Sequence, residues 1–338
     1  MFAGSISFTP RGQTVTIPRR QFLRLATGAA ALAGAETARA ETYPVRPVHI
    51  IVATTAGGAT DIAARLIAQW LTTKLGQSFV VENRSGGNNN VGSEFAAHAP
   101  ADRYTLFMAN SVNSINTVLY KHLNYNFVTD FTPIVRVMGS TLFLLVHPAV
   151  PAKTVPEFIA YAKANPGKVT MGSGGSGSTG HLAGELFMMR TGVHMVHVPY
   201  RGESAALTDL LAGQPQVMFS TTGSAMSFVK AGTVRALAVT SSTRLDSLPD
   251  IPTLAQFVPG YEVNSWSGLC APKKTPNGIV TLLNTPTNAA LTDPTIRQRI
   301  ADMGGVAPGG SPAAFAAYIN DEIGRWEKVV AFAHIQVN

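Results

Sequence analysis

Short apolar runs alternate with amphipathic stretches along this chain from about residue 48 onward. Runs rich in Val, Ile and Phe predict strands, and apolar positions three and four apart predict helices. The expected strands cover residues 48–52, 79–82, 104–109, 169–171, 194–200, 217–219 and 234–240, with a loop at 220–223. The expected helices cover about residues 62–71, 91–98, 181–189, 204–212 and 312–330, and one more begins near Thr154 or Val155. This alternation is typical of parallel sheets that bind ligands beyond the carboxyl ends of their strands.

Two apolar runs are longer than the other predicted strands. They cover residues 136–146 and 261–271, and the second follows an irregular connection marked by Pro249, Pro252 and Pro259. A new series of strand-helix units begins after the first run. The chain is long enough to bury a large core, and we expect it to form two lobes.

The loop at residues 171–182 (MGSGGSGSTGHL) joins a predicted strand to a predicted helix and carries few large side chains. Unpaired N–H groups and the positive end of the helix dipole meet at a helix N-terminus, so this loop is suited to an anionic ligand. Gly172, Gly174 and Gly177 match the G-x-G-x-x-G pattern of dinucleotide sites, whereas the Ser and Thr hydroxyls suit a small carboxylate. The same residues could also form a flexible loop without a ligand.

A dinucleotide site needs an acidic residue at the end of the next strand to bind the ribose. That strand ends at Tyr200 and is followed by Arg201 and Gly202, and Glu203 comes only beyond a turn. The acidic partner is therefore missing. Because Arg201 could bind a 2′-phosphate, an exported NADP-dependent oxidoreductase that uses the loop from Gly172 to Gly177 remains the alternative hypothesis.

The first 40 residues have the order of regions found in an export signal. Arg19 and Arg20 precede Phe and Leu, a weakly apolar run covers residues 26–35, and a small-x-small motif ends at Ala40. We expect a twin-arginine signal peptide over residues 1–40, cleaved after Ala40, and a periplasmic mature protein. The segment carries five arginines and one glutamate, so its removal lowers the formal charge from +7 to +3.

Composition excludes several classes of protein. The remaining basic residues are scattered, which gives no support to nucleic-acid binding. Cys270 is the only cysteine, so intramolecular disulfides and cysteine metal sites are excluded. No G-x-S-x-G elbow, H-E-x-x-H motif or Cys-His pair is present, and the eight histidines lack metal-ligand spacing. We therefore expect neither an enzyme nor a cofactor or metal.

Several sequence blocks carry a family resemblance. They are residues 43–47 (YPVRP), Gly57-Gly58 with Asp61, 81–84 (VENR), 181–185 (HLAGE), 198–202 (VPYRG), 207–211 (LTDLL) with Gly213-Gln214, 249–253 (PDIPT), 259–261 (PGY) with Trp266, and Ala271-Pro272. In this order and spacing the chain resembles the substrate-binding proteins of tripartite tricarboxylate transporters, the TctC or Bug family. Prolines common in the first loop of relatives are replaced by Thr54, Thr55 and Ala56, and Arg103 replaces a usual glycine.

The resemblance implies an α/β, two-lobed periplasmic binding-protein fold (type II-like), in which each lobe is a mainly parallel sheet flanked by helices. Two crossover strands join the lobes, which we place at residues 41–140 plus 264–338 and at 141–263. The ligand in the cleft is expected to be a small carboxylate: a di- or tricarboxylate, or an aromatic carboxylate. The expected partners are the permease subunits of such a transporter, and the protein is expected to be a monomer.

The expected ligand-binding residues come from strand ends and loops that face the cleft. They are Thr54, Thr55, Ala56, Gly57, Asn110, Ser111, Asn113, Gly174, Ser176, Ser178, Thr179, His181, Tyr200, Ser220, Thr221, Thr222 and Trp266. Two glycine-containing loops, one from each lobe, could hold both ends of a dicarboxylate through backbone and hydroxyl groups. Asp61 is expected to cap its own helix or pair locally, because it would repel an anion. His181 could be a cap or a ligand donor, and Tyr200 and Trp266 could pack the wall or stack on the ligand.

Overall fold

The computed structural model describes residues 6–8, 15–17 and 43–335, and the chain divides into two compact units, Met1–Val45 and Arg46–Asn338. In the first unit, β1 (Ile6–Phe8) and β2 (Val15–Ile17) form an antiparallel pair. The paired arginines, the apolar run and the cleavage site predicted at Ala40 lie outside the described residues.

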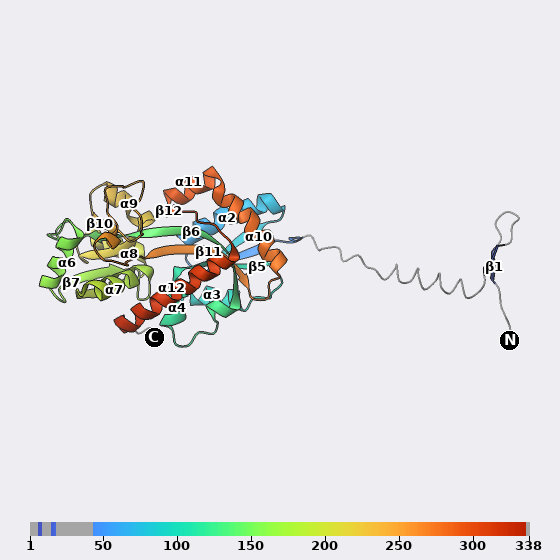
Figure 1. Ribbon diagram of the computed structural model, residues 1–338, viewed down its shortest axis with the longest axis horizontal. Helices are drawn as coiled ribbons and strands as arrows, with labels where there is room; N and C mark the ends of the chain where they lie inside the picture. The colour runs from blue at the N-terminus through green and yellow to red at the C-terminus, as the bar shows by residue number, and fades with distance from the viewer. Residues whose placement is uncertain (1–5, 9–14, 18–42, 336–338) are drawn as a thin grey trace. The chain divides into compact units, whose positions relative to one another are not determined.

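The second unit is built on a ten-stranded sheet (Figure 1). Neighbouring strands follow the order β4, β3, β5, β11, β6, β9, β7, β8, and β10 and β12 also pair with β6. The strands are β3 (Val48–Val52), β4 (Phe79–Asn83), β5 (Thr105–Asn110), β6 (Phe131–Val146), β7 (Val169–Ser173), β8 (Met195–Pro199), β9 (Val217–Thr221), β10 (Arg235–Val239), β11 (Asn264–Pro272) and β12 (Gly305–Val306). The helices are α2 (Ala59–Leu75), α3 (Asn90–Ala97), α4 (Ser111–Leu119), α5 (Phe127–Asp130), α6 (Val155–Ala164), α7 (Thr179–Thr191), α8 (Glu203–Leu211), α9 (Thr222–Lys230), η1 (Leu254–Gln256), α10 (Asn277–Thr292), α11 (Pro294–Asp302) and α12 (Pro312–Ala333).

Parallel strands form the outer part of each half of the sheet. In the first half β3 pairs in parallel with β4 and β5, and in the second half β7 pairs in parallel with β8 and β9. Val48, Ile50 and Val52 are fully buried, as expected for a parallel strand covered by helices on both faces. The carboxyl ends of these strands lead into helices, which places several helix N-termini along the middle of the unit.

Strands β6 and β11 are the two crossovers. The first part of β6, up to Thr141, pairs with β11, and its last part, from Leu142 to Val146, pairs with β9 and β10. The extended runs predicted at residues 136–146 and 261–271 correspond to these strands. β11 begins only at Asn264, and Tyr261, at the start of the predicted run, is fully buried with its hydroxyl donating to the carbonyl oxygen of Ala183.

The structure corrects the prediction of a loop at residues 220–223. Ser220 and Thr221 remain in β9, opposite Phe143 and Leu142 of β6, and α9 begins at the next residue. The sequence analysis also missed α10 and α11. Helix α10 contains Pro286, and α11 begins at Pro294, so prolines obscured a helical region.

The carboxyl-terminal helix α12 contacts both halves, because it packs on α4 and on α7. Its buried residues Phe315 and Ile319 join the core around Phe107, whereas Trp326 and Val329 join the core around Phe187. Figure 1 shows α12, α4 and α7 below the strands, and α2, α9 and α11 above them. Within the described ranges, no helix combines the length and apolar character needed to cross a membrane.

Candidate functional site

A cavity of about 330 Å³ lies where the two halves of the sheet meet. The N-terminus of α2 contributes Gly57, Gly58, Ala59, Thr60 and Ile62, and the crossover strands contribute Met138, Ser140, Ser265, Trp266 and Ser267. The far wall consists of Ser204, Thr221, Gly223 and Ser224, with Asp302 and Met303 from the end of α11. Among these lining residues, hydroxyl and backbone groups dominate, and none is a lysine or an arginine.

The α2 wall presents a helix N-terminus to the cavity. Gly57 has a φ of 83°, and Gly58 caps α2 without a side-chain hydrogen bond. The first N–H groups of a helix have no partner within the helix, and they lie at the positive end of its dipole. This wall can therefore bind a carboxylate without a cationic side chain.

Asp61 holds the α2 loop in place, as predicted. Its carboxylate accepts hydrogen bonds from the Gly57 N–H at 2.9 Å, from the Arg65 guanidinium at 3.0 Å and from the Asn83 amide at 3.0 Å. Burial would raise the pKa of Asp61, but these hydrogen bonds and the charge of Arg65 outweigh it and hold the pKa below its usual value. Asp61 is therefore a paired structural carboxylate and not a group that faces a ligand.

The opposite wall contains the N-terminus of α9. The sequence had predicted a loop at residues 220–223 instead of the start of this helix. Thr221 is the N-cap, and its side chain does not cap the helix. It donates instead toward Glu203, whose carboxylate also accepts hydrogen bonds from the Thr221 N–H and from Ser220 Oγ. A carboxylate of the protein thus already occupies part of this wall.

The crossover strands provide the third wall. Ser267 Oγ is buried and has no hydrogen-bond partner in the described part of the chain. Ser265 Oγ lies 3.4 Å from Ser111 Oγ, which lies 2.9 Å from Thr179 Oγ1. This row of hydroxyls connects the cavity wall with the N-termini of α4 and α7.

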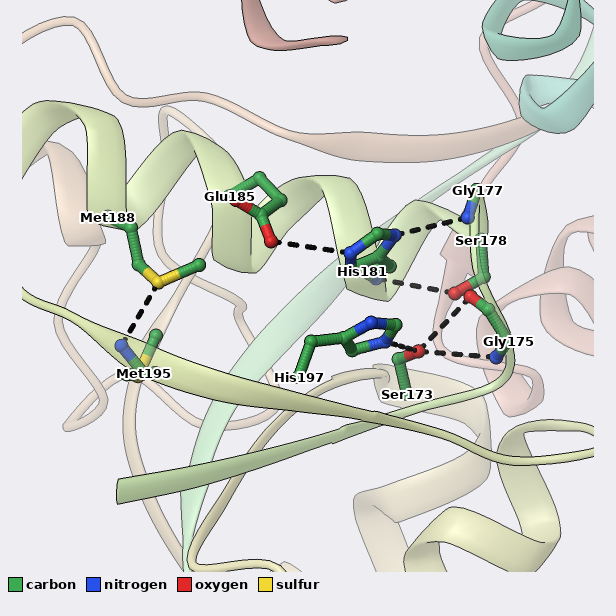
Figure 2. Close-up of polar contacts among 9 residues, drawn as sticks. All are labelled: Ser173, Gly175, Gly177, Ser178, His181, Glu185, Met188, Met195 and His197. Atoms are coloured by element: carbon green, nitrogen blue, oxygen red, sulfur yellow. Dashed lines mark hydrogen bonds and ion pairs between the residues drawn. The ribbon is translucent and has the colours of Figure 1, made fainter. Parts of the chain in front are cut away.

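The glycine loop itself does not line the cavity. Figure 2 shows His181 between Gly177 and Glu185: its Nδ1 accepts from the Gly177 N–H at 3.1 Å, and its Nε2 lies 3.3 Å from Glu185 Oε1. Ser178 Oγ caps α7 by accepting from the His181 N–H. A Cβ on Gly177 would lie 2.4 Å from Leu119 of α4. The loop is thus ordered by its own side chains and packs against the other half.

His197 packs against His181 and Ser173, below His181 in Figure 2. Its ring stacks on His181 with centroids 3.6 Å apart, and its Nε2 lies 2.6 Å from Ser173 Oγ. Burial, together with the neighbouring His181, lowers the pKa of His197 to about 3. His197 is therefore neutral at physiological pH and supplies no charge for an anion.

Several of the remaining predicted residues have structural partners, whereas Thr54 Oγ1 is buried without a hydrogen-bond partner among the described residues. Asn110 and Asn113 form a capping box on α4, and Thr222 Oγ1 donates to the carbonyl oxygens of Gly304 and Thr141. Gly57, Thr221 and Trp266 are the predicted residues that line the cavity. The others lie outside its lining: Thr54, Thr55, Ala56, Asn110, Ser111, Asn113, Gly174, Ser176, Ser178, Thr179, His181, Tyr200, Ser220 and Thr222. A ligand role for these residues stays a prediction.

Sequence reasoning missed several residues of the cavity, above all Ser140, Ser265 and Ser267 on the crossovers, and it also missed Glu203, which binds Thr221 next to the cavity. A signal was present, because hydroxyl residues interrupt the middle of two long apolar runs. A buried strand that carries unpaired hydroxyls needs a reason, and a ligand is a common one.

Comparison with known proteins decides the family. A model of the tripartite tricarboxylate transporter family receptor, TctC, matches residues 63–334. The chain belongs to this family.

This TctC receptor matches several solved structures over almost their entire length. R. palustris Rpa4515 with adipate is 38% identical with a TM-score of 0.79, and the match covers 87% of this chain and 99% of the relative. The periplasmic binding protein BugD is 32% identical with a TM-score of 0.76, and the match covers 87% and 99%. MatC (Rpa3494) from Rhodopseudomonas palustris with bound malate is 32% identical with a TM-score of 0.75, and the match covers 85% and 100%.

These matches confirm the predicted family and the α/β periplasmic binding-protein fold. The TctC receptor is a solute-binding protein of a periplasmic family and is not an enzyme, so the oxidoreductase alternative is set aside. The glycines that suggested a dinucleotide site have a packing role instead. A Cβ on Gly177 would lie 2.4 Å from Leu119, one on Gly174 would lie 3.0 Å from the Glu203 backbone nitrogen, and one on Gly172 would lie 3.1 Å from the Pro215 ring.

Proposed function

We propose that this TctC receptor captures a small carboxylate in the cavity between α2 and α9 and delivers it to the permease subunits of a tripartite tricarboxylate transporter. The observation that carries the proposal is a cavity walled by both halves of the sheet, with the uncapped N-terminus of α2 on one side. Two relatives bind carboxylates of suitable size, adipate and malate. We expect the receptor to act as a monomer.

Hydrogen bonds are sufficient to bind such a ligand. Each charge-assisted hydrogen bond to a carboxylate contributes roughly 1.5–3 kcal/mol net. Four to six of them could give a micromolar dissociation constant, about −8 kcal/mol, after the costs of association. The proposed donors are the N–H groups at the start of α2 and the hydroxyls of Ser140, Ser265 and Ser267.

Ser267→Ala tests the cavity directly. If Ser267 Oγ binds the ligand, its removal should weaken carboxylate binding about tenfold, the equivalent of roughly 1.4 kcal/mol. The stability of the ligand-free protein should stay equal or rise, because the lost hydroxyl is buried without a partner. Thermal unfolding and calorimetric titration of the mature protein against mono-, di-, tri- and aromatic carboxylates, with NADP included, provide both measurements.

Ser242→Ala, at an exposed position outside the cavity, serves as the control and should change neither quantity. A ligand at 100 times its dissociation constant adds about 2.7 kcal/mol to stability, so true binding is readily seen. Stabilisation by NADP alone would contradict the proposal. So would a carboxylate bound equally well by Ser267→Ala.

We also propose that the chain forms two lobes, one made of residues 41–140 plus 264–338 and the other of residues 141–263. Bending of the crossover strands would close the two lobes over the ligand. The supporting observation is that β6 exchanges partners between Thr141 and Leu142, while β11 begins at Asn264. The cavity lies beside this exchange, so bending there would change its width.

We further propose that the receptor reaches the periplasm by the twin-arginine route and is cleaved after Ala40. The support is the order of the arginine pair, apolar run and small-x-small motif, together with the periplasmic family. The periplasmic protein should begin at Glu41, as read by N-terminal sequencing. Replacing both Arg19 and Arg20 by Lys should leave it uncleaved in the cytoplasm, and normal export of that variant would contradict the route.

A further inference from the structure

Glu203 does not itself line the cavity, but its carboxylate places a negative charge next to Thr221 of the α9 wall. The side chain extends from the first turn of α8, and its Oε1 accepts from Ser220 Oγ at 2.7 Å and from Thr221 Oγ1 at 3.0 Å, as well as from the Thr221 N–H. Thr221 lines the cavity, and so does Ser204, the residue after Glu203. The donors that a ligand carboxylate would need at this wall therefore already serve a carboxylate of the protein.

A second acidic group lines the cavity. It is Asp302, at the end of α11, and its Oδ1 accepts from the Gln298 amide at 2.8 Å. Asp302 also lines an adjoining hollow together with Arg65 and Arg299, and Arg65 is paired with Asp61. None of the residues that line the cavity itself is a cation.

The α2 wall has the opposite character. It offers the free N–H groups of a helix N-terminus, and the nearby charge of Asp61 is balanced by Arg65 at 3.0 Å. The α2 wall is therefore the positive one, and the wall at Thr221 has the negative charge of Glu203 next to it. A carboxylate is favoured at one end of the cavity and disfavoured at the other.

We propose that Glu203 is a specificity-determining residue, so that the site takes a carboxylate whose second end is a hydrogen-bond donor or a cation. A hydroxyl, amide or ammonium group fits this description, and a second carboxylate does not. Glu203 would act through its charge beside Thr221, whose Oγ1 lies 3.0 and 3.1 Å from the two oxygens of the carboxylate. The inference rests on the proposed carboxylate function and narrows its ligand class.

The test uses three probes of equal length that share one carboxylate: succinate, 4-hydroxybutyrate and 4-aminobutyrate. The mature protein should bind the last two at least about tenfold more tightly than succinate, because like charges brought together are a strong means of rejecting a wrong ligand. In Glu203→Gln this preference should shrink to within about threefold, since the amide removes the charge at nearly the same shape.

The salt dependence of the ligand preference distinguishes an electrostatic role of Glu203 from a purely structural one, which salt would not affect. The preference of the wild type should diminish between low salt and 1 M NaCl, where the screening length falls to about 3 Å. Asp302→Asn should shift the preference in the same direction as Glu203→Gln, and it remains informative if Glu203→Gln does not fold. Asp209→Asn removes a charge from the same helix outside the cavity lining and should leave the preference unchanged.

The possible outcomes separate the two proposals. A protein that binds no carboxylate of any kind contradicts the proposed function. A protein that binds succinate as tightly as 4-hydroxybutyrate, with the ratio unchanged in Glu203→Gln and Asp302→Asn, contradicts the role of Glu203 and leaves carboxylate capture standing. Binding of some other carboxylate with no affinity for any of the three probes also counts against the inference.

Discussion

Gly180→Ala is expected to lower the free energy of unfolding by about 3 kcal/mol, the upper part of the range for added methyl groups in a packed interior. A Cβ at this position would lie 2.4 Å from the carbonyl oxygen of Phe219, which belongs to the backbone of β9 and cannot turn away. Helix α7 would have to withdraw from the sheet. That movement would also disturb the aromatic contact of Phe187 with Phe219, whose ring centroids are 5.9 Å apart.

Gly324→Ala is the matched control and should have the opposite sign. Gly324 lies inside α12, and a Cβ there meets nothing within 4 Å. Replacing an unhindered helical glycine by alanine adds roughly 0.5–1 kcal/mol of stability. Urea unfolding of both variants measures the pair. Equal stability of Gly180→Ala and the wild type would show that close packing of α7 on β9 does not explain this glycine.

Asp61→Ala is expected to lower the free energy of unfolding by about 3 kcal/mol and to weaken carboxylate binding, because hydrogen bonds to a buried charged group are among the stronger ones. The substitution leaves the Gly57 N–H, the Asn83 amide and the Arg65 guanidinium without their acceptor. Gly57 belongs to the cavity wall, so the loop that presents the α2 N-terminus loses its anchor.

The effect of Asp61 should depend on pH with a definite sign. Its pKa in the folded protein lies below the ordinary value of 3.8, so its stabilising contribution is fully present above pH 3.8 and is lost as the pH falls through the folded value. The gap in unfolding free energy between wild type and Asp61→Ala should be constant at neutral pH and narrow below pH 3.8. Asp250→Ala, at an exposed position, should produce no such gap. A gap that widens in acid would contradict the pairing of Asp61.

Local signals in the sequence predicted much of the fold. Thr154 accepts the N-cap hydrogen bond of α6, Gly76 ends α2 in the left-handed conformation, and Asn110 begins α4 with a capping box. Each signal acts within one turn of helix, so neighbouring residues are sufficient to reveal it. The two crossovers were also predictable, because they are mostly buried and their sequences are accordingly apolar over most of their length.

The site was less predictable, because its walls come from segments far apart in the sequence. The glycine-rich loop attracted a ligand hypothesis, yet Gly177 and Gly180 accommodate Leu119 and Phe219, neither of which is near in sequence. Ser220 and Thr221 were expected in a loop, but pairing with β6 extends the strand and lets α9 begin at once. Glu203 could not be placed next to the cavity until its carboxylate was seen at the end of β9.

The position of β11 also constrains how the protein can be made. This strand lies between β5 and β6 in the sheet, although more than a hundred residues separate it from either in the sequence. While the chain is being synthesised, β5 and β6 therefore keep open edges until residues 264–272 have emerged. Unpaired strand edges invite association with other chains. Fragments that end before Asn264 should be prone to aggregation, and only the nearly complete polypeptide can close its own sheet.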